Sequence, residues 1–210
     1  MAIMSAPNPY NVTAQLESAL CEYSGSKYCV CVESGSAAIL LSLFWFKEKK
    51  GNLGVVQCPK FTYPSIPCSI IFLGGKVQFI DEDWEGIYRL NPYPIIDGAL
   101  RFRRGMYKLG TFHMISAHQK KIFNLGRGGA ILLDDEEAYE WLKRARFDGR
   151  GPMPLMQDKF TQLVLNVYME PTTAARGLQW LQANWDKEFQ DLSRESQVYV
   201  DLSQFDIYKK

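Results

Sequence analysis

The sequence predicts an α/β protein in which a mostly parallel sheet is flanked by helices. Short apolar runs of strand length alternate with longer apolar segments of helical period along residues 12–80, as in folds that join strands through crossover helices. A Ser-Gly-Ser turn connects one such strand to its helix, which is typical of open α/β sheets. Because 47% of the 210 residues are hydrophobic and 13% are aromatic, the chain can bury an ordinary core.

The first part of the chain is expected to supply three strands and three helices. The first helix carries apolar side chains at helical spacing and ends at Gly25. The second is apolar almost all round until its lysine-rich end, which indicates a buried helix. In order, the expected elements are helix 12–24, strand 28–32, helix 37–49, strand 54–58, helix 64–73 and strand 76–80.

The second part is expected to complete the sheet and to add helices. A strand over residues 94–97 ends in Asp97, at the edge where ligands bind in open α/β sheets. Residues 112–116 alternate like a strand, and a glycine-rich turn leads back into a second apolar run, 130–133. The remaining expected elements are a helix from an Asp134-Asp135 cap to 146, helices over 160–167 and 171–192, and one short strand within 196–210.

Charge and composition exclude several classes of partner. The net charge of +1 arises from 24 basic and 23 acidic residues, which offers no field for nucleic acid or an anionic membrane. No segment approaches the roughly 20 apolar residues of a membrane span, and the first residues lack a signal-peptide pattern, so a cytoplasmic protein is expected. Five cysteines in apolar runs are expected to be reduced, and with only two histidines no metal site is expected.

Two stretches have residue types that suit a chemical role. Lys121 lies at a strand end, where a primary amine can form a Schiff base with an aldehyde cofactor if burial or nearby cations lower its pKa. The alternative is a surface turn with two solvated lysines. Gly35 and Ser36 open a helix, and free N–H groups with hydroxyls at a helix N-terminus bind phosphate. The alternative there is an ordinary capped turn.

Four blocks of residues, in order along the chain, carry a family resemblance. They are Glu33-Ser34-Gly35-Ser36-Ala37-Ala38, similar to S-G-T-A-A-L; Pro59-Lys60-Phe61-Thr62-Tyr63, similar to P-x-F-T-F; Asp97-Gly98-Ala99, similar to D-x-A; and Ser116-x-x-x-x-Lys121 with Gly126-x-Gly128-Gly129, similar to S-F-H-x-x-K and G-x-G-G. In this order they resemble the DegT/DnrJ/EryC1/StrS family of pyridoxal-phosphate-dependent sugar aminotransferases. The resemblance covers residues 16–181.

The resemblance implies a reduced form of the large domain of pyridoxal-phosphate (PLP) fold type I over residues 1–192. The tail, 193–210, would be a remnant of a small C-terminal domain that is largely absent. Between residue 80 and the D-x-A strand the family places a strand and a helix, but only 84–93 intervene here. A parallel crossover needs about 10–12 residues with its helix, so a strand-helix unit is expected to be lost and the sheet to be narrowed.

The same resemblance implies a role for each matching residue. Lys121 would hold pyridoxal 5'-phosphate as an aldimine and carry the proton, and Asp97 would keep the pyridine nitrogen protonated. Gly35, Ser36 and Ser116 would hold the phosphate, and Tyr63 would stack on the cofactor ring. Asn166 matches an asparagine that reaches the phosphate from the other subunit, which implies a homodimer with composite sites.

Three positions depart from the family pattern. Ala117 replaces an aromatic residue, Tyr168 replaces an arginine, and Leu100 replaces a glutamine or histidine near the phenolic oxygen of the cofactor. Leucine has no hydrogen-bonding group, so some tuning of the cofactor is expected to be lost. The missing small domain weakens the expectation of a nucleotide-sugar pocket more than that of a cofactor site.

The resemblance implies a PLP-dependent aminotransferase that moves an amino group from an amino-acid donor, expected to be glutamate, to a keto-sugar nucleotide. Two alternatives remain. An enzyme of another reaction type, such as a sugar dehydratase, would carry histidine in place of Lys121. A binding or scaffold protein would keep the fold without turnover, in line with the general rule that a fold does not fix a function.

Overall fold

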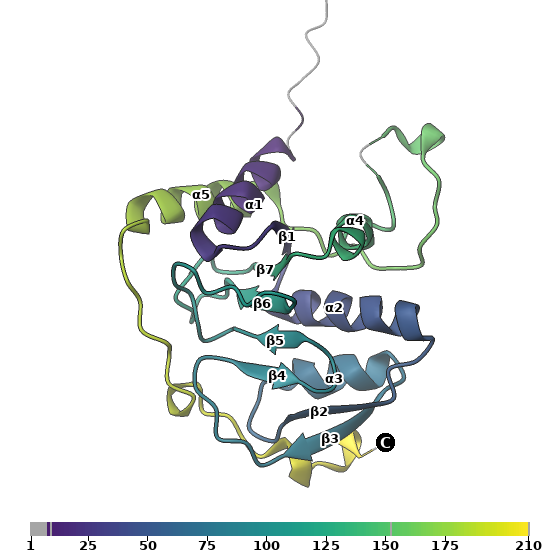
Figure 1. Ribbon diagram of the computed structural model, residues 1–210, viewed down its shortest axis with the longest axis vertical. Coiled ribbons are helices and arrows are strands. Elements are labelled where there is room, and N and C mark those ends of the chain that lie inside the picture. The colour runs from purple at the N-terminus through teal and green to yellow at the C-terminus, as the bar shows by residue number, and fades with distance from the viewer. Residues whose placement is uncertain (1–7, 9, 152, 210) are drawn as a thin grey trace, which may run out of the picture.

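A mixed sheet of five strands lies at the centre of the fold, with helices against both faces (Figure 1). The computed structural model describes residues 8, 10–151 and 153–209. The strands run in the order β1 (Tyr28–Val32), β7 (Gly129–Leu133), β6 (Phe112–Ser116), β5 (Ile95–Asp97) and β4 (Tyr88–Leu90). Only β5 and β6 are parallel neighbours in this sheet. The predicted α/β class is confirmed, but the sheet is mixed rather than mostly parallel.

The helices form two layers, one on each face of the sheet. One layer contains α2 (Gly35–Lys50), α3 (Ser65–Phe72) and α4 (Glu136–Ala145), and the other contains α1 (Asn11–Ser24) packed against α5 (Pro171–Asn184). Alternate residues of β1 serve the two layers, since Val30 joins the core of α2 and Cys31 joins the core of α1. None of the described helices is long and apolar enough to cross a membrane.

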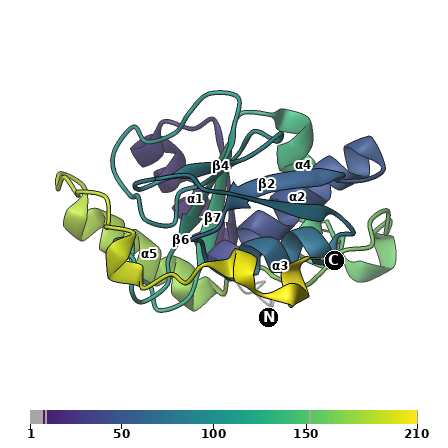
Figure 2. The same ribbon diagram turned by 90° about the horizontal axis from the view of Figure 1, so that it is seen from below.

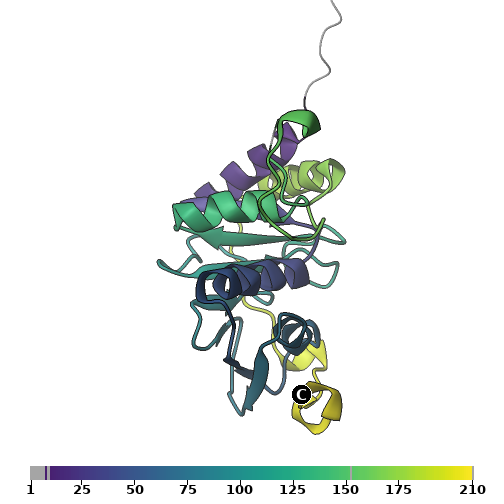
Figure 3. The ribbon, with the colours of Figure 1, turned by 90° about the vertical axis from the view of Figure 1, so that its right-hand side faces the viewer.

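A parallel pair of strands, β2 (Val55–Pro59) and β3 (Lys76–Ile80), is joined by α3. In Figure 3 this pair lies at the end of the molecule opposite α1 and α5. The backbone N–H of Gln57 donates to the carbonyl of Asn91 at 2.7 Å, which ties β2 to the residue after β4. The connection between β2 and α3 therefore reaches the edge at which β5 ends, where Thr62 meets Tyr88.

Residues 84–93 differ from the sequence-based expectation of a narrowed sheet. They contain no helix, but they supply β4, which pairs antiparallel with β5. Because β4 lies between β5 and the β2 and β3 pair, the strand position expected to be lost is filled. A tight hairpin needs far fewer connecting residues than a parallel crossover, so this short segment still provides a strand.

Near the C-terminus, two predicted elements are wrong and the end of a third differs from the prediction. Residues 160–167 form no helix. Of the apolar side chains at helical spacing, Phe160 and Leu163 are exposed, whereas Val164 and Val167 pack against the core. Helix α5 ends at Asn184 rather than near 192. The strand expected within 196–210 is replaced by the short 3-10 turns η2 (Glu195–Gln197), η3 (Leu202–Gln204) and η4 (Asp206–Tyr208). Figure 2 shows this tail, in yellow, running beside α3.

Candidate functional site

Lys121 lies in the turn after β6, and its side chain is half-buried. Its backbone N–H donates to the carbonyl of His118 at 2.9 Å, which closes the turn. Its Nζ donates to Oε1 of Gln197 at 2.7 Å. Burial lowers the pKa of Lys121, the charge of Asp97 acts in the opposite direction, and the charge of Lys120 adds to the lowering. Because Lys120 is exposed, Lys121 is the lysine of this pair that faces the interior.

Asp97 is the last residue of β5, and it is buried. Its Oδ2 accepts a hydrogen bond from the hydroxyl of Tyr88 at 2.5 Å, and its Oδ1 accepts from the Ala99 N–H at 2.9 Å. Burial raises the pKa of Asp97, while these two hydrogen bonds and the charge of Lys121 act to lower it. The structure therefore brings together the two residues predicted to be catalytic.

Tyr88 connects Asp97 to the loop after β2. Its hydroxyl lies 2.5 Å from Oγ1 of Thr62 as well as from Asp97, so the three side chains form one buried chain of hydrogen bonds. Burial and the negative charge of Asp97 raise the pKa of Tyr88 well above its ordinary value. Tyr88 is thus a neutral donor to the carboxylate. Its ring packs against that of Trp84, with centroids 4.6 Å apart.

Hydroxyl groups gather around the N-terminus of α2. Ser34 caps this helix by accepting a hydrogen bond from the Ala37 N–H at 3.1 Å. The Ser36 hydroxyl donates to that of Ser65 at 2.9 Å. Gly35 packs closely on Ser116, because a Cβ added to Gly35 would lie 3.2 Å from Oγ of Ser116. The three residues predicted to hold a phosphate therefore lie together, and such a group of hydroxyls and N–H donors suits an anion.

Tyr63 and Asn166, the other two residues predicted to bind the cofactor, are both exposed. The Tyr63 side chain is 58% exposed, and it lies close enough to Tyr199 for its charge to affect the pKa of that residue. Burial is the larger cause of the raised pKa of Tyr199, followed by the charge of Asp97. Asn166 is exposed, and its side-chain amide donates a hydrogen bond to Asp148 at 2.5 Å. Within one chain its side chain is therefore directed to Asp148 and not to the predicted phosphate-binding residues.

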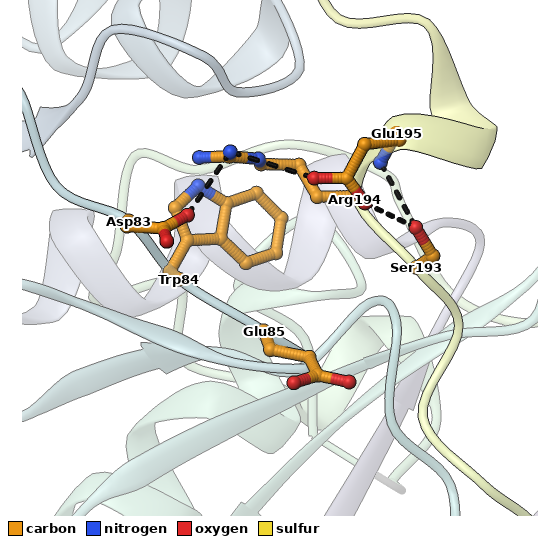
Figure 4. A pocket seen from close by; sticks show the side chains of 6 residues that line it. All are labelled: Asp83, Trp84, Glu85, Ser193, Arg194 and Glu195. Carbon is orange, nitrogen blue, oxygen red and sulfur yellow. Dashed lines mark hydrogen bonds and ion pairs between the residues drawn. The ribbon is translucent and has the colours of Figure 1, made fainter.

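A cavity of about 330 Å³ lies beside Trp84 (Figure 4). It is lined by Asp83, Trp84, Glu85, Ser193, Arg194 and Glu195. Arg194 spans its two walls, since its guanidinium lies 3.0 Å from Asp83 and 3.5 Å from Glu195 of its own segment. The C-terminal tail is therefore attached to the segment that leads into β4.

Sequence reasoning did not identify several residues of this site. Tyr88 enters it because β4 pairs with β5 in the register that sets Tyr88 opposite Asp97. Gln197 and Tyr199 enter it from the tail, far away in sequence. One signal was available for Tyr88, because Tyr-Arg-Leu alternates apolar and polar residues as a strand does. The sequence holds no such signal for Gln197.

The fold and these side chains define a class of site: a half-buried amine beside a buried carboxylate, next to a helix N-terminus rich in hydroxyls. Comparison with known proteins finds similarity to one family of aminotransferases. Residues 6–92 match the model of the DegT/DnrJ/EryC1/StrS aminotransferase family. The chain is 22% identical over 250 residues to the UDP-4-amino-4,6-dideoxy-N-acetyl-beta-L-altrosamine transaminase of Campylobacter jejuni, covering 93% of this chain and 65% of that protein.

Solved structures of aminotransferases have a similar fold. PseC of Helicobacter pylori, an aminotransferase involved in the biosynthesis of pseudoaminic acid, superposes with a TM-score of 0.75 at 13% identity, over 94% of this chain and 79% of PseC. Spr1654 of Streptococcus pneumoniae, in its PLP-form, gives a TM-score of 0.64 at 17% identity, over 81% of this chain and 59% of the other. The fold is that of the type I aminotransferases, and the resemblance carried by the motifs is confirmed. The chain spans about two thirds of its curated relative.

Proposed function

We propose that the chain is a PLP-dependent aminotransferase that moves an amino group from an amino-acid donor, with glutamate the expected donor, to a keto-sugar nucleotide. The observation that carries this proposal is the half-buried Lys121 amine next to the buried Asp97 carboxylate. The named activities of the related Campylobacter and Helicobacter proteins support the substrate class.

The residues present fit the cofactor. The Lys121 amine suits its aldehyde carbon, the Asp97 carboxylate its ring nitrogen, and the hydroxyls around the N-terminus of α2 its phosphate. Tyr63 offers an aromatic face for the ring. When bound, PLP supplies an electron sink that stabilises negative charge on the substrate carbon.

Lys121 has two tasks in this proposal, and both require an amine that loses its proton readily. As a nucleophile it must present a free electron pair, and as a base it must take a proton from the substrate carbon and return it. Burial and the neighbouring Lys120 charge lower its pKa, which serves both tasks.

Asp97 must remain ionised to hold a proton on the ring nitrogen. Burial works against this charge, but Tyr88 and the Ala99 N–H each donate a hydrogen bond to one carboxylate oxygen. Hydrogen bonds to the charged form favour that form. Each oxygen has a second lone pair, so a donor on the cofactor can still be accepted.

We also propose a homodimer in which Asn166 of one chain reaches the predicted phosphate-binding residues of the other, namely Gly35, Ser36 and Ser116. Residues 153–165 project from the fold beside α4 (Figure 1) and expose large apolar side chains. Met156 and Leu163 are each 95% exposed. A second copy that covers this arm removes apolar surface from water and brings Asn166 toward a neighbouring site.

The test of the proposed activity begins with cofactor uptake. Purified protein mixed with PLP is expected to gain an absorption band in the visible, and borohydride reduction with peptide mapping is expected to place the cofactor on Lys121. Modification of Lys120, or none, contradicts the assignment. Addition of glutamate is then expected to abolish the visible band as the amino group is transferred. A protein that binds PLP firmly but converts with no amino donor would instead be non-catalytic.

A further inference from the structure

Residues 191–202, here called the strap, contact Lys121 through Gln197 and are attached at both ends. At the first end, Arg101 and Asp191 form a largely buried ion pair at 2.5 Å, and the Leu192 N–H donates to the Leu100 carbonyl at 2.8 Å. At the other end, the Leu202 N–H donates to the Lys60 carbonyl at 2.9 Å. Because both ends are held, the position of the residues between them is defined.

The middle of the strap directs two side chains toward the site. Gln197 accepts the hydrogen bond from Lys121, and Tyr199 lies against Trp84 with ring centroids 6.0 Å apart. Between them Val198 has a φ of 53°, in the left-handed region that a β-branched residue rarely adopts. Arg194 fastens this part of the strap to Asp83 (Figure 4). The backbone is thus bent at the point that turns Gln197 toward the lysine.

We propose that Gln197 is a positioning residue of this site, whose carboxamide oxygen holds the Lys121 amine in its charged, unreactive form. This inference rests on the function proposed above for Lys121. An amide oxygen accepts hydrogen bonds, and an ammonium group donates them more strongly than a neutral amine does. Release of Gln197 therefore makes the amine more nucleophilic without any change at Lys121 itself.

Two charged groups, Asp97 and Lys120, also act on the same amine. Asp97 of β5 favours the charged form, and Lys120 of the same turn disfavours it. From the strap, Tyr199 contributes no charge at neutral pH, because its pKa is raised. Burial disfavours the charged form as well. Gln197 is the hydrogen-bond acceptor that contacts Nζ directly, so exchange of its side chain changes one interaction and leaves these others in place.

The test is acylation of the cofactor-free chain with N-hydroxysuccinimidyl acetate between pH 7 and 11, followed by peptide mapping. Gln197→Met removes the acceptor and keeps the length of the side chain, whereas Gln197→Glu places a carboxylate on the amine. The pH midpoint for Lys121 is expected to fall by about one unit in the first variant and to rise by about as much in the second. A purely structural role would not move the midpoint in opposite directions.

Lys120 serves as the reference within the same peptide, and Gln190→Met serves as the matched control, because Gln190 is exposed just before the strap. Neither is expected to change the Lys121 midpoint. Two Gln197 variants that shift it the same way, or leave it within about a third of a unit, overturn the proposal. Uptake of PLP is measured separately. Opposite shifts in a protein that never takes up PLP uphold the role of Gln197 and refute the proposed activity.

Discussion

At Asp97 the surroundings oppose the charge that the proposed chemistry needs. Burial raises its pKa above the ordinary value despite the hydrogen bonds that it accepts. A carboxyl group with a pKa raised by folding stabilises the fold fully below its unfolded pKa and loses that contribution as the pH rises through the folded pKa. We therefore predict that Asp97→Asn raises the thermal midpoint of the cofactor-free chain at pH 7, whereas at pH 3 the two proteins unfold together.

The same variant is expected to slow the half-reaction, which is the transfer of the amino group from glutamate to bound PLP, by about a hundredfold or more. The reason is that it removes the negative charge that would keep the ring nitrogen of PLP protonated. Asp186→Asn is the matched control, because the Asp186 side chain is 97% exposed and its ion pair with Arg104 is long, at 3.6 Å. That control should leave both measurements unchanged. A lower midpoint for Asp97→Asn at pH 7 contradicts the argument.

Tyr88 is predicted to set the pH range in which Asp97 is ionised. Tyr88→Phe removes the donor to Oδ2, so the pKa of Asp97 rises further and the half-reaction is expected to need a higher pH. Loss of a hydrogen bond to a charged group costs about 1.5–3 kcal/mol. Thr62→Val removes only the outer link of the chain and should shift the pH profile less. Equal shifts in the two variants speak against a direct role for Tyr88.

For individual residues, the sequence was informative where a residue lies at a recognisable motif position. Asp97 ends one apolar strand and Lys121 lies in the turn after an alternating strand, so their proximity could be predicted from the parallel pairing of two strand ends. Tyr88 and Gln197 depend on strand register and on the path of the tail. These are properties of tertiary packing, which local patterns do not encode.

Among the elements, the first residue of β7 packs closely against the backbone at the start of α2. A Cβ on Gly129 would lie 2.5 Å from the carbonyl carbon of Ser34, so backbone would have to move. Gly129→Ala is predicted to destabilise the chain by about 1–3 kcal/mol, as measured by urea unfolding. Phosphate-dependent binding of PLP is expected to weaken as well, because the clash displaces the helix N-terminus that carries Gly35 and Ser36.

Gly51→Asn is the control for this prediction. Gly51 has open space around its Cβ position and a left-handed φ of 78°, which asparagine tolerates better than most residues. Its cost should remain below that of Gly129→Ala, and PLP binding should not change. If Gly129→Ala unfolds at the urea concentration of the parent chain, the close packing of the hairpin on α2 is not a constraint.

The elements that the sequence predicted correctly are those with a strong period and a clear end signal. Helix α4 begins after Asp135, whose side chain accepts a hydrogen bond from the Ala138 N–H at 3.0 Å, as expected of a helix cap. Residues 160–167 have comparable spacing, but Phe160 and Leu163 at that spacing are exposed. Strand β4 is three residues long, and its existence depends on the exposed edge of β5. Periodicity cannot supply that information.

For the whole molecule, the exposed arm at residues 153–165 leads to a prediction about assembly. Light scattering at micromolar concentration should give twice the chain mass, and Leu163→Glu should reduce it to that of a single chain. Leu109→Glu is the control, since Leu109 is 85% exposed but lies in the turn before β6. A parent chain that is monomeric and still binds PLP normally removes the idea that Asn166 completes a neighbouring site.

The strap also determines how the proposed site responds to ligand concentration. If the cofactor enters only when Gln197 has left Lys121, the apparent dissociation constant equals the intrinsic one divided by the fraction of molecules with an open strap. Affinity is then set partly by contacts that touch no ligand. The ion pair between Arg101 and Asp191 is such a contact. Asp191→Asn, which shifts this population toward open molecules, is accordingly expected to tighten PLP binding.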